Sequence, residues 1–88
     1  MITRTATIGS SVGLHARPAA IFASAAADTG IDVGIALGDD EAVDAGSILE
    51  VMTLGAKHGD VVTLSSDDDT AGPVLDQLVT LLESDLDA

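Results

Sequence analysis

The hydrophobic residues of this chain follow two different periods, and the order in which these periods alternate limits the fold more than any other feature. Between residues 31 and 37, Ile, Val, Ile and Leu occupy every second position, which is typical of a β-strand with one buried face. Between residues 70 and 86, the apolar positions repeat at three and four residues, which predicts an amphipathic helix. The alternation therefore predicts a mixed α and β protein.

The rest of the chain extends this pattern. We expect further strands and helices in the following segments: strands at 2–8, 41–45 and 60–66, and helices at 16–27 and 47–54. The turn at 38–40 should join two of the strands into a hairpin. The resulting order is β-α-β-β-α-β-α, and 88 residues suffice for a single domain over 1–88. Short strands with helices between them favour an α+β fold, with an antiparallel sheet covered by helices on one face.

The charge of the chain excludes several classes of function. Fifteen acidic residues face three bases (Arg4, Arg17 and Lys57), which gives a net charge of −12. No basic stripe is available for nucleic acid or for an anionic membrane surface. The hydrophobic content of 47% argues against disorder, and the lack of cysteine excludes disulfides and thiolate metal sites. No segment resembles a signal peptide or a membrane span, so we expect a cytoplasmic protein. The sequence also has no cofactor motif, and we expect neither a cofactor nor a metal.

One short segment carries residues suited to phosphate chemistry. His15 precedes the helix at 16–27, and Pro18 fits the first turn, where a missing N–H has no cost. The N–H groups of Ala16 and Arg17 at a helix start form an anion site, and the Arg17 guanidinium matches phosphate oxygens. His15 could then attack a phosphoryl group and hold it there. The alternative is that His15 is a solvated residue at the helix start and Arg17 a solubilising charge.

Two motifs resemble those of the HPr family, the histidine phosphocarriers of the bacterial phosphotransferase system. Residues 13–20, GLHARPAA, resemble the active-site signature, and residues 47–55, SILEVMTLG, resemble the serine-site signature. The resemblance implies an open-faced β-sandwich and a monomer that relays phosphoryl groups from Enzyme I, charged by phosphoenolpyruvate, to a sugar-specific IIA component. It also implies that His15 carries the phosphoryl group on Nδ1, with Arg17 assisting.

Two other functions remain open at this point. A regulatory module of the same fold would bind transcriptional or metabolic partners according to its phosphorylation state. A small-ligand domain would need no His-Arg pair at all. The only other histidine, His58, is expected to be a surface residue in the loop 56–59.

Ser47 has a structural and a regulatory interpretation. With Glu50 it fits a capping box, in which each side chain accepts a hydrogen bond from the backbone N–H of the other residue. The resemblance implies a target for a dedicated serine kinase, but Gly46 stands where a basic residue usually precedes the serine. We therefore favour the helix cap.

The resemblance also implies a docking surface for Enzyme I and IIA. Ile48, Leu49 and Met52 on the helix at 47–54 should form at least part of it, and Phe22 should be divided between the core and the rim of this surface. The alternative is that these residues all belong to the core. Four positions lack the basic residues that many family members carry: Ser24, Ala27, Gly46 and Glu50. Partners must then be less acidic or bind mainly through apolar contacts.

The acidity itself needs a cause, because a phosphocarrier does not require it. A surface rich in Asp and poor in Lys suits a cytoplasm of molar salt, where the Debye length shrinks to roughly 3 Å. We therefore expect the chain to come from a halophile.

Overall fold

Strands and helices alternate along the chain in the predicted order. The computed structural model describes residues 1–86. Its elements are β1 (Ile2–Thr7), α1 (Ala16–Asp28), β2 (Gly34–Leu37), β3 (Val43–Asp44), α2 (Ile48–Thr53), β4 (Val61–Ser66) and α3 (Gly72–Glu83). No helix within these residues is long and apolar enough to cross a membrane.

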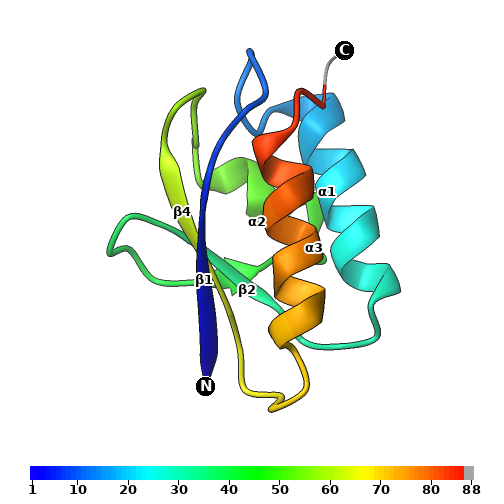
Figure 1. Cartoon of the computed structure of the whole chain (residues 1–88). Helices are drawn as coiled ribbons and strands as arrows, with labels where there is room; N and C mark the ends of the chain where they lie inside the picture. Colours follow the sequence, from blue (N-terminus) through cyan, green and yellow to red (C-terminus); the bar gives the residue numbers. More distant parts are fainter. Residues whose placement is uncertain (87–88) are drawn as a thin grey trace.

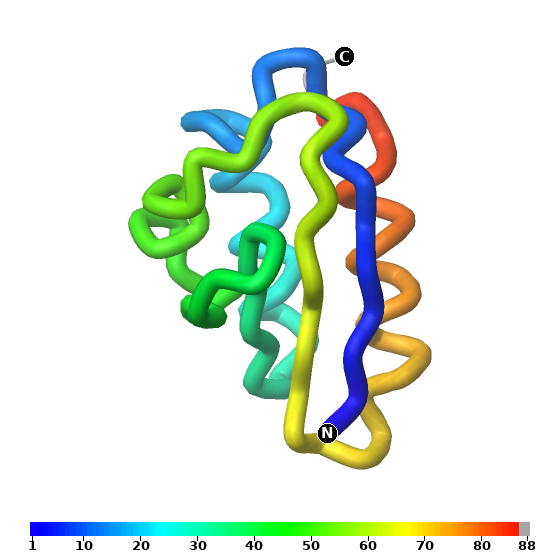
Figure 2. Tube along the Cα trace, turned by 90° about the vertical axis from the view of Figure 1, so that its left-hand side faces the viewer, coloured from blue at the N-terminus to red at the C-terminus, as the bar shows by residue number. Residues whose placement is uncertain are grey.

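The four strands form one antiparallel sheet in the order β1-β4-β2-β3. Figure 1 shows α1 and α3 side by side on one face of this sheet, and α2 packs against α1 on the same side. Figure 2 shows β1 and β4 running next to each other, with Ala6 opposite Val62. The other face is uncovered and carries exposed side chains such as Thr3 and Thr5. The predicted α+β fold, with one open face, is confirmed.

The core lies between the sheet and the helices and consists of small aliphatic side chains around a single aromatic ring. Val62 and Leu64 point inward from β4, Leu75 points inward from α3, and all three are fully buried. Phe22 of α1 is also 0% exposed. Large apolar side chains of this kind contribute roughly 1.5–3 kcal/mol each when buried.

The strand at 31–37 is shorter than its alternation predicts, because β2 begins only at Gly34. The Thr29 hydroxyl accepts a hydrogen bond from the Ile31 N–H and donates to the Ala26 carbonyl. A side chain that occupies backbone groups in this way competes with the sheet for them. The hairpin between β2 and β3 is confirmed, although β3 spans only two residues.

The last helix is also shorter than the predicted 70–86. At its start, the Thr70 N–H and hydroxyl both donate to Asp68 Oδ1, which makes a turn before Gly72. At its end, the Ser84 N–H and hydroxyl both donate to the Leu81 carbonyl. Side chains of turn-forming residues therefore close the helix at both ends.

Arg4 is the one charged residue that interrupts the apolar side of β1. Its side chain is 41% exposed and lies at the sheet edge, where Nε contacts Asp76 Oδ1 of α3 at 2.8 Å. Another guanidinium nitrogen donates to the Thr3 carbonyl. Arg4 thus joins β1 to α3 and is not available at the end of the molecule where α1 begins.

Candidate functional site

His15 is the N-cap residue of α1. Its backbone is extended, with φ −100° and ψ −177°, and its carbonyl accepts the first helical hydrogen bond from Ala19 at 2.8 Å. The imidazole makes no capping hydrogen bond and is exposed to solvent. It contacts no polar partner among residues 1–86, so both ring nitrogens are accessible.

The helix start beside His15 offers two free donors. The N–H groups of Ala16 and Arg17 have no partner within the described chain, as expected for the first turn of a helix. Pro18 has no N–H, and the Ala19 N–H is already bonded to His15. The Arg17 side chain is exposed and forms no ion pair with any residue of 1–86. A positive helix end and a free guanidinium therefore lie within two residues of His15.

Gly13 allows the loop before His15 to approach the loop at 56–59. Its φ of +74° is unfavourable for other residues, and a Cβ at this position would overlap the Ala56 carbonyl. The Leu14 N–H donates to that same carbonyl at 2.9 Å. The backbone that leads into His15 is therefore fixed by a close contact that only glycine permits.

This arrangement is suited to phosphoryl transfer. An imidazole nitrogen can act as the nucleophile, and backbone donors with a guanidinium can bind the oxygens of the transferred group. No group of three His, Cys, Asp or Glu residues within the described chain could hold a metal ion. The predicted residues His15, Ala16 and Arg17 lie together at one helix start.

Comparison with known proteins identifies the family. Residues 2–84 match the family model described as the PTS HPr component phosphorylation site. The chain belongs to the HPr phosphocarrier family. It is 42% identical over 87 residues to the phosphocarrier protein HPr of Streptomyces coelicolor, which covers 99% of this chain and 94% of that protein. It is 39% identical over 82 residues to the HPr of Haloferax volcanii, covering 92% of each chain.

The fold agrees with this assignment. A crystal structure of HPr from Thermoanaerobacter tengcongensis superposes with a TM-score of 0.87 at 36% identity. The match covers 100% of this chain and 98% of the other. The HPr resemblance in the two sequence motifs is thereby confirmed at the level of the family.

Ser47 is the N-cap of α2, but the predicted capping box forms only in part. The Ser47 hydroxyl accepts a hydrogen bond from the Glu50 N–H at 3.4 Å. The Glu50 carboxylate, in contrast, accepts from the Asp44 N–H. The reciprocal bond fails because the Ser47 N–H already donates to the Asp44 carbonyl at 3.2 Å.

Most of the exposed apolar residues of this HPr-family protein lie on α1, on α2 and in the loop before α1. Ile48 is 45% and Leu49 77% exposed, whereas Met52 is half-buried. Phe22 is fully buried, so the prediction that it divides between core and rim is wrong: α1 turns this ring entirely toward the sheet. Four exposed apolar residues escaped prediction: Val12 at 58% and Ile21 at 36% near α1, and Met1 and Val61 on the sheet side of the molecule.

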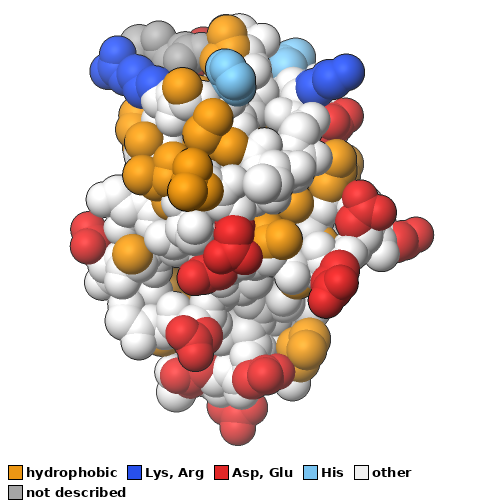
Figure 3. Space-filling view, turned by 180° about the vertical axis from the view of Figure 1, so that it is seen from behind, with side chains coloured by type: hydrophobic (Ala, Val, Ile, Leu, Met, Phe, Trp, Pro, Cys, Tyr) orange, Lys and Arg blue, Asp and Glu red, His pale blue; other side chains and the backbone are white. Residues whose placement is uncertain are grey.

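Figure 3 shows how side chains of each kind gather on this face. Lys, Arg and His side chains lie at one end, beside a patch of hydrophobic side chains, whereas most Asp and Glu side chains lie further down. A single exposed hydrophobic residue is unremarkable, but several together next to Arg17 and Lys57, which form no ion pair within residues 1–86, are typical of a contact surface.

His58 has a contact that its sequence position does not reveal. It is exposed, as predicted, but its Nδ1 lies 3.3 Å from the carbonyl oxygen of Ser10 in the loop before His15. The two residues are 48 positions apart, and no local pattern indicates that they meet.

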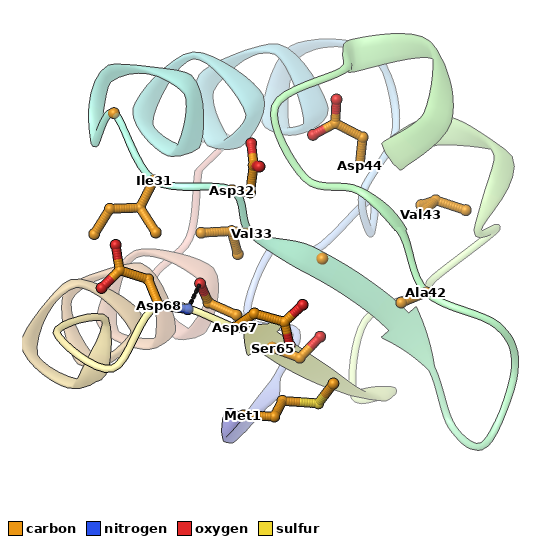
Figure 4. Close-up of a pocket in the computed structure, with 13 residues that line it drawn as sticks. Met1, Ile31, Asp32, Val33, Ala42, Val43, Asp44, Ser65, Asp67 and Asp68 are labelled. Atoms are coloured by element: carbon orange, nitrogen blue, oxygen red, sulfur yellow. Dashed lines mark hydrogen bonds between the residues drawn. The ribbon is translucent and has the colours of Figure 1, made fainter.

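A hollow lies elsewhere, at the end of the molecule where β4 leads into α3. It has a volume of about 580 Å³, and Asp32, Asp44, Asp67 and Asp68 are among its lining residues. Figure 4 shows that Asp44 of β3 and Asp68 of the loop between β4 and α3 stand apart. Hydrogen bonds from the Thr70 hydroxyl and N–H hold the pKa of Asp68 below its ordinary value of 3.8. A hollow lined by carboxylates repels phosphate, so it does not compete with His15 as the functional site.

Proposed function

We propose that this protein accepts a phosphoryl group on His15 from phospho-Enzyme I and passes it to a IIA component of a sugar permease. The observation that carries the proposal is the exposed, unpartnered His15 ring beside two free N–H groups and the free Arg17 side chain. In a chain of net charge −12, this is a rare place where an anion is attracted.

The transfer needs one bond formed and one bond broken at each step. The lone pair of a His15 ring nitrogen, Nδ1 by family resemblance, attacks phosphorus while the bond from phosphorus to Enzyme I breaks. Ala16 and Arg17 N–H groups and the Arg17 guanidinium then bind the phosphoryl oxygens. Transfer to IIA repeats the step with His15 as the leaving group, so the carrier is regenerated.

Labelling with phosphate tests this function directly. Incubation with a cognate Enzyme I and phosphoenolpyruvate should add one acid-labile, base-stable phosphate per chain. His15→Ala should accept none, whereas the control variant His58→Asn should still accept one. Continued labelling of His15→Ala would reject the assignment.

Docking of the partners is proposed to use Ile48, Leu49 and Met52, with the additional exposed residues Val12 and Ile21. The exposure of Leu49 and the neighbouring cations support this surface. Because Ser24, Ala27 and Glu50 supply no positive charge, apolar contact must provide most of the binding energy.

Ser47 is proposed to act as a helix cap and not as the target of a serine kinase. Its hydroxyl is engaged with the Glu50 N–H, and the two carboxylates of Asp44 in β3 and Glu50 in α2 accept from backbone N–H groups just before it. A phosphate on Ser47 would meet these negative charges and no cation from the preceding Gly46.

The acidic surface is proposed to adapt a monomeric, cytoplasmic protein to molar salt. Fifteen acids against three bases, and the similarity to the HPr of Haloferax volcanii, support this proposal. Thermal melts should show a higher Tm in multimolar KCl than in low salt, because screening removes repulsion. Equal Tm values would reject it.

The regulatory alternative is less well supported. The relatives named above are phosphocarriers, and both His15 and Arg17 are present and exposed. Deletion of the gene should therefore impair uptake of at least one sugar, whereas normal uptake of every sugar would favour a regulator.

A further inference from the structure

The orientation of the loop that carries His15 depends on contacts outside the loop. The His15 ring has no hydrogen-bond partner within residues 1–86, so its position is set by the backbone at residues 10–15. Within this loop the Gly13 N–H donates to the Ser10 carbonyl at 3.0 Å, which closes a turn just before the helix. An interaction that fixes the Ser10 carbonyl therefore also fixes the turn that precedes His15.

Ser10 cannot be held by its own hydroxyl. The residue is 0% exposed, and its Oγ has no hydrogen-bond partner. Its carbonyl is its connection to the loop at 56–59, where it lies 3.3 Å from His58 Nδ1. A carbonyl oxygen only accepts, so this bond requires a hydrogen on Nδ1 of His58.

The turn that presents His58 is itself well ordered. The Asp60 N–H donates to the Lys57 carbonyl, and the Lys57 N–H donates to Asp60 Oδ2, both at 2.9 Å. Gly59, with φ +87°, completes the turn and donates to the Ile8 carbonyl. Because this turn is already fixed, His58 loses little conformational entropy when it donates to the Ser10 carbonyl. More of the free energy of the hydrogen bond then stabilises the position of Ser10.

We infer that His58 is a positioning residue for phosphoryl transfer: its Nδ1–H donates to the Ser10 carbonyl and holds the turn at 10–13 that places His15. The inference rests on the proposed role of His15. The hydrogen bond of His58 goes to the Ser10 carbonyl and not to His15, so its effect reaches the reaction through the backbone of the loop.

Two substitutions separate the hydrogen bond from the rest of the side chain. His58→Leu keeps much of the volume but removes the donor, whereas His58→Asn places an amide nitrogen close to where Nδ1 stands. His58 is exposed, so both variants should fold, which circular dichroism and Tm will check.

In single-turnover transfer from phospho-Enzyme I, His58→Leu should lower the rate constant at saturation by roughly two- to tenfold, as expected for one hydrogen bond. The Enzyme I concentration at half-maximal rate should stay unchanged, and His58→Asn should restore the rate.

A measurement without any partner protein provides an independent readout. Amide hydrogen exchange at Gly13 and Leu14 should accelerate in His58→Leu and return toward the wild-type rate in His58→Asn. Equal exchange and equal transfer rates in His58→Leu and wild type would overturn the inference, and so would an equal loss in both variants. If the wild type takes up no phosphate on His15, the proposed function fails. Hydrogen exchange still tests whether the bond from His58 to the Ser10 carbonyl holds the loop.

Discussion

The start of α1, at one end of this molecule, and the loop after β4, at the other end, treat their backbone donors in opposite ways. At the histidine end, formed by residues 10–17, 48–52 and 56–58, the first N–H groups of α1 and the His15 and Arg17 side chains have no partner among residues 1–86. At the acidic end, formed by residues 30–34, 42–44 and 65–68, side chains occupy the backbone groups: Ser66 Oγ accepts from the Asp68 N–H. The acidic end has a hollow, yet the residues suited to phosphoryl transfer lie at the histidine end. Unmet donors and rare cations therefore point to a candidate site that shape alone does not.

The test with the largest expected effect removes the guanidinium of Arg17. Arg17→Ala should lower the rate of phosphoryl transfer from Enzyme I by about 10- to 100-fold, because a charge-assisted hydrogen bond contributes roughly 1.5–3 kcal/mol. Single-turnover kinetics measures this loss. The control Asp67→Asn changes one charge at the acidic end and should leave the rate unchanged. Asp67→Asn shifts the net charge in the opposite direction from Arg17→Ala, so a gain in rate of matching size would mean that net charge, and not the local arrangement, governs transfer.

A second test places a charge on the exposed apolar residues of the histidine end. Leu49→Asp should raise the Enzyme I concentration at half-maximal rate about tenfold or more, as expected for an interface residue with a large contribution. Its Tm should change little, because Leu49 is 77% exposed. Val61→Asp adds the same charge on the uncovered face of the sheet and should not weaken binding. If it weakens binding equally, docking is not confined to the histidine end.

The helix next to the docking residues provides a test of smaller size. Ser47→Ala should lower the free energy of unfolding by about 1 kcal/mol, the usual effect of losing an N-cap, measured by denaturant titration. Ser47→Asp should restore it, because Asp also caps helices. Ser24→Ala, at an exposed position in α1, serves as the control. A stable Ser47→Ala would contradict the capping role.

The smallest effect is expected at the acidic end. Because the pKa of Asp68 is lowered in the folded protein, its carboxylate stabilises the fold above the ordinary value of 3.8, and this contribution is lost as the pH falls through the lowered pKa. Asp68→Asn keeps an oxygen for Thr70 but removes the charge. Its Tm should therefore lie slightly below that of the wild type at pH 7 and match it near pH 2. A difference that persists in acid would assign the effect to geometry instead.

Sequence patterns predicted the layers of the fold well, because burial on one face imposes its period on the chain. The ends of elements were harder to predict: β2 starts late since the Thr29 hydroxyl occupies the backbone of Ile31, an interaction that periodicity cannot show. For the site, the segment around His15 was visible because a helix start and its Pro18 are local features. The burial of Phe22 and the bond from His58 to Ser10 were not visible, since both depend on how distant segments pack.

Pro18 has a consequence for how tightly a phosphoryl group would be bound at the start of α1. The phosphoryl group proposed on His15 would expose three oxygens, yet the proline replaces what would be a third donor beside Ala16 and Arg17. The helix start can therefore satisfy the group only in part, and an incoming receiver can complete its coordination. Because some phosphoryl oxygens lack a hydrogen-bond donor on the carrier, transfer of the group to the receiver is favoured over its retention on His15.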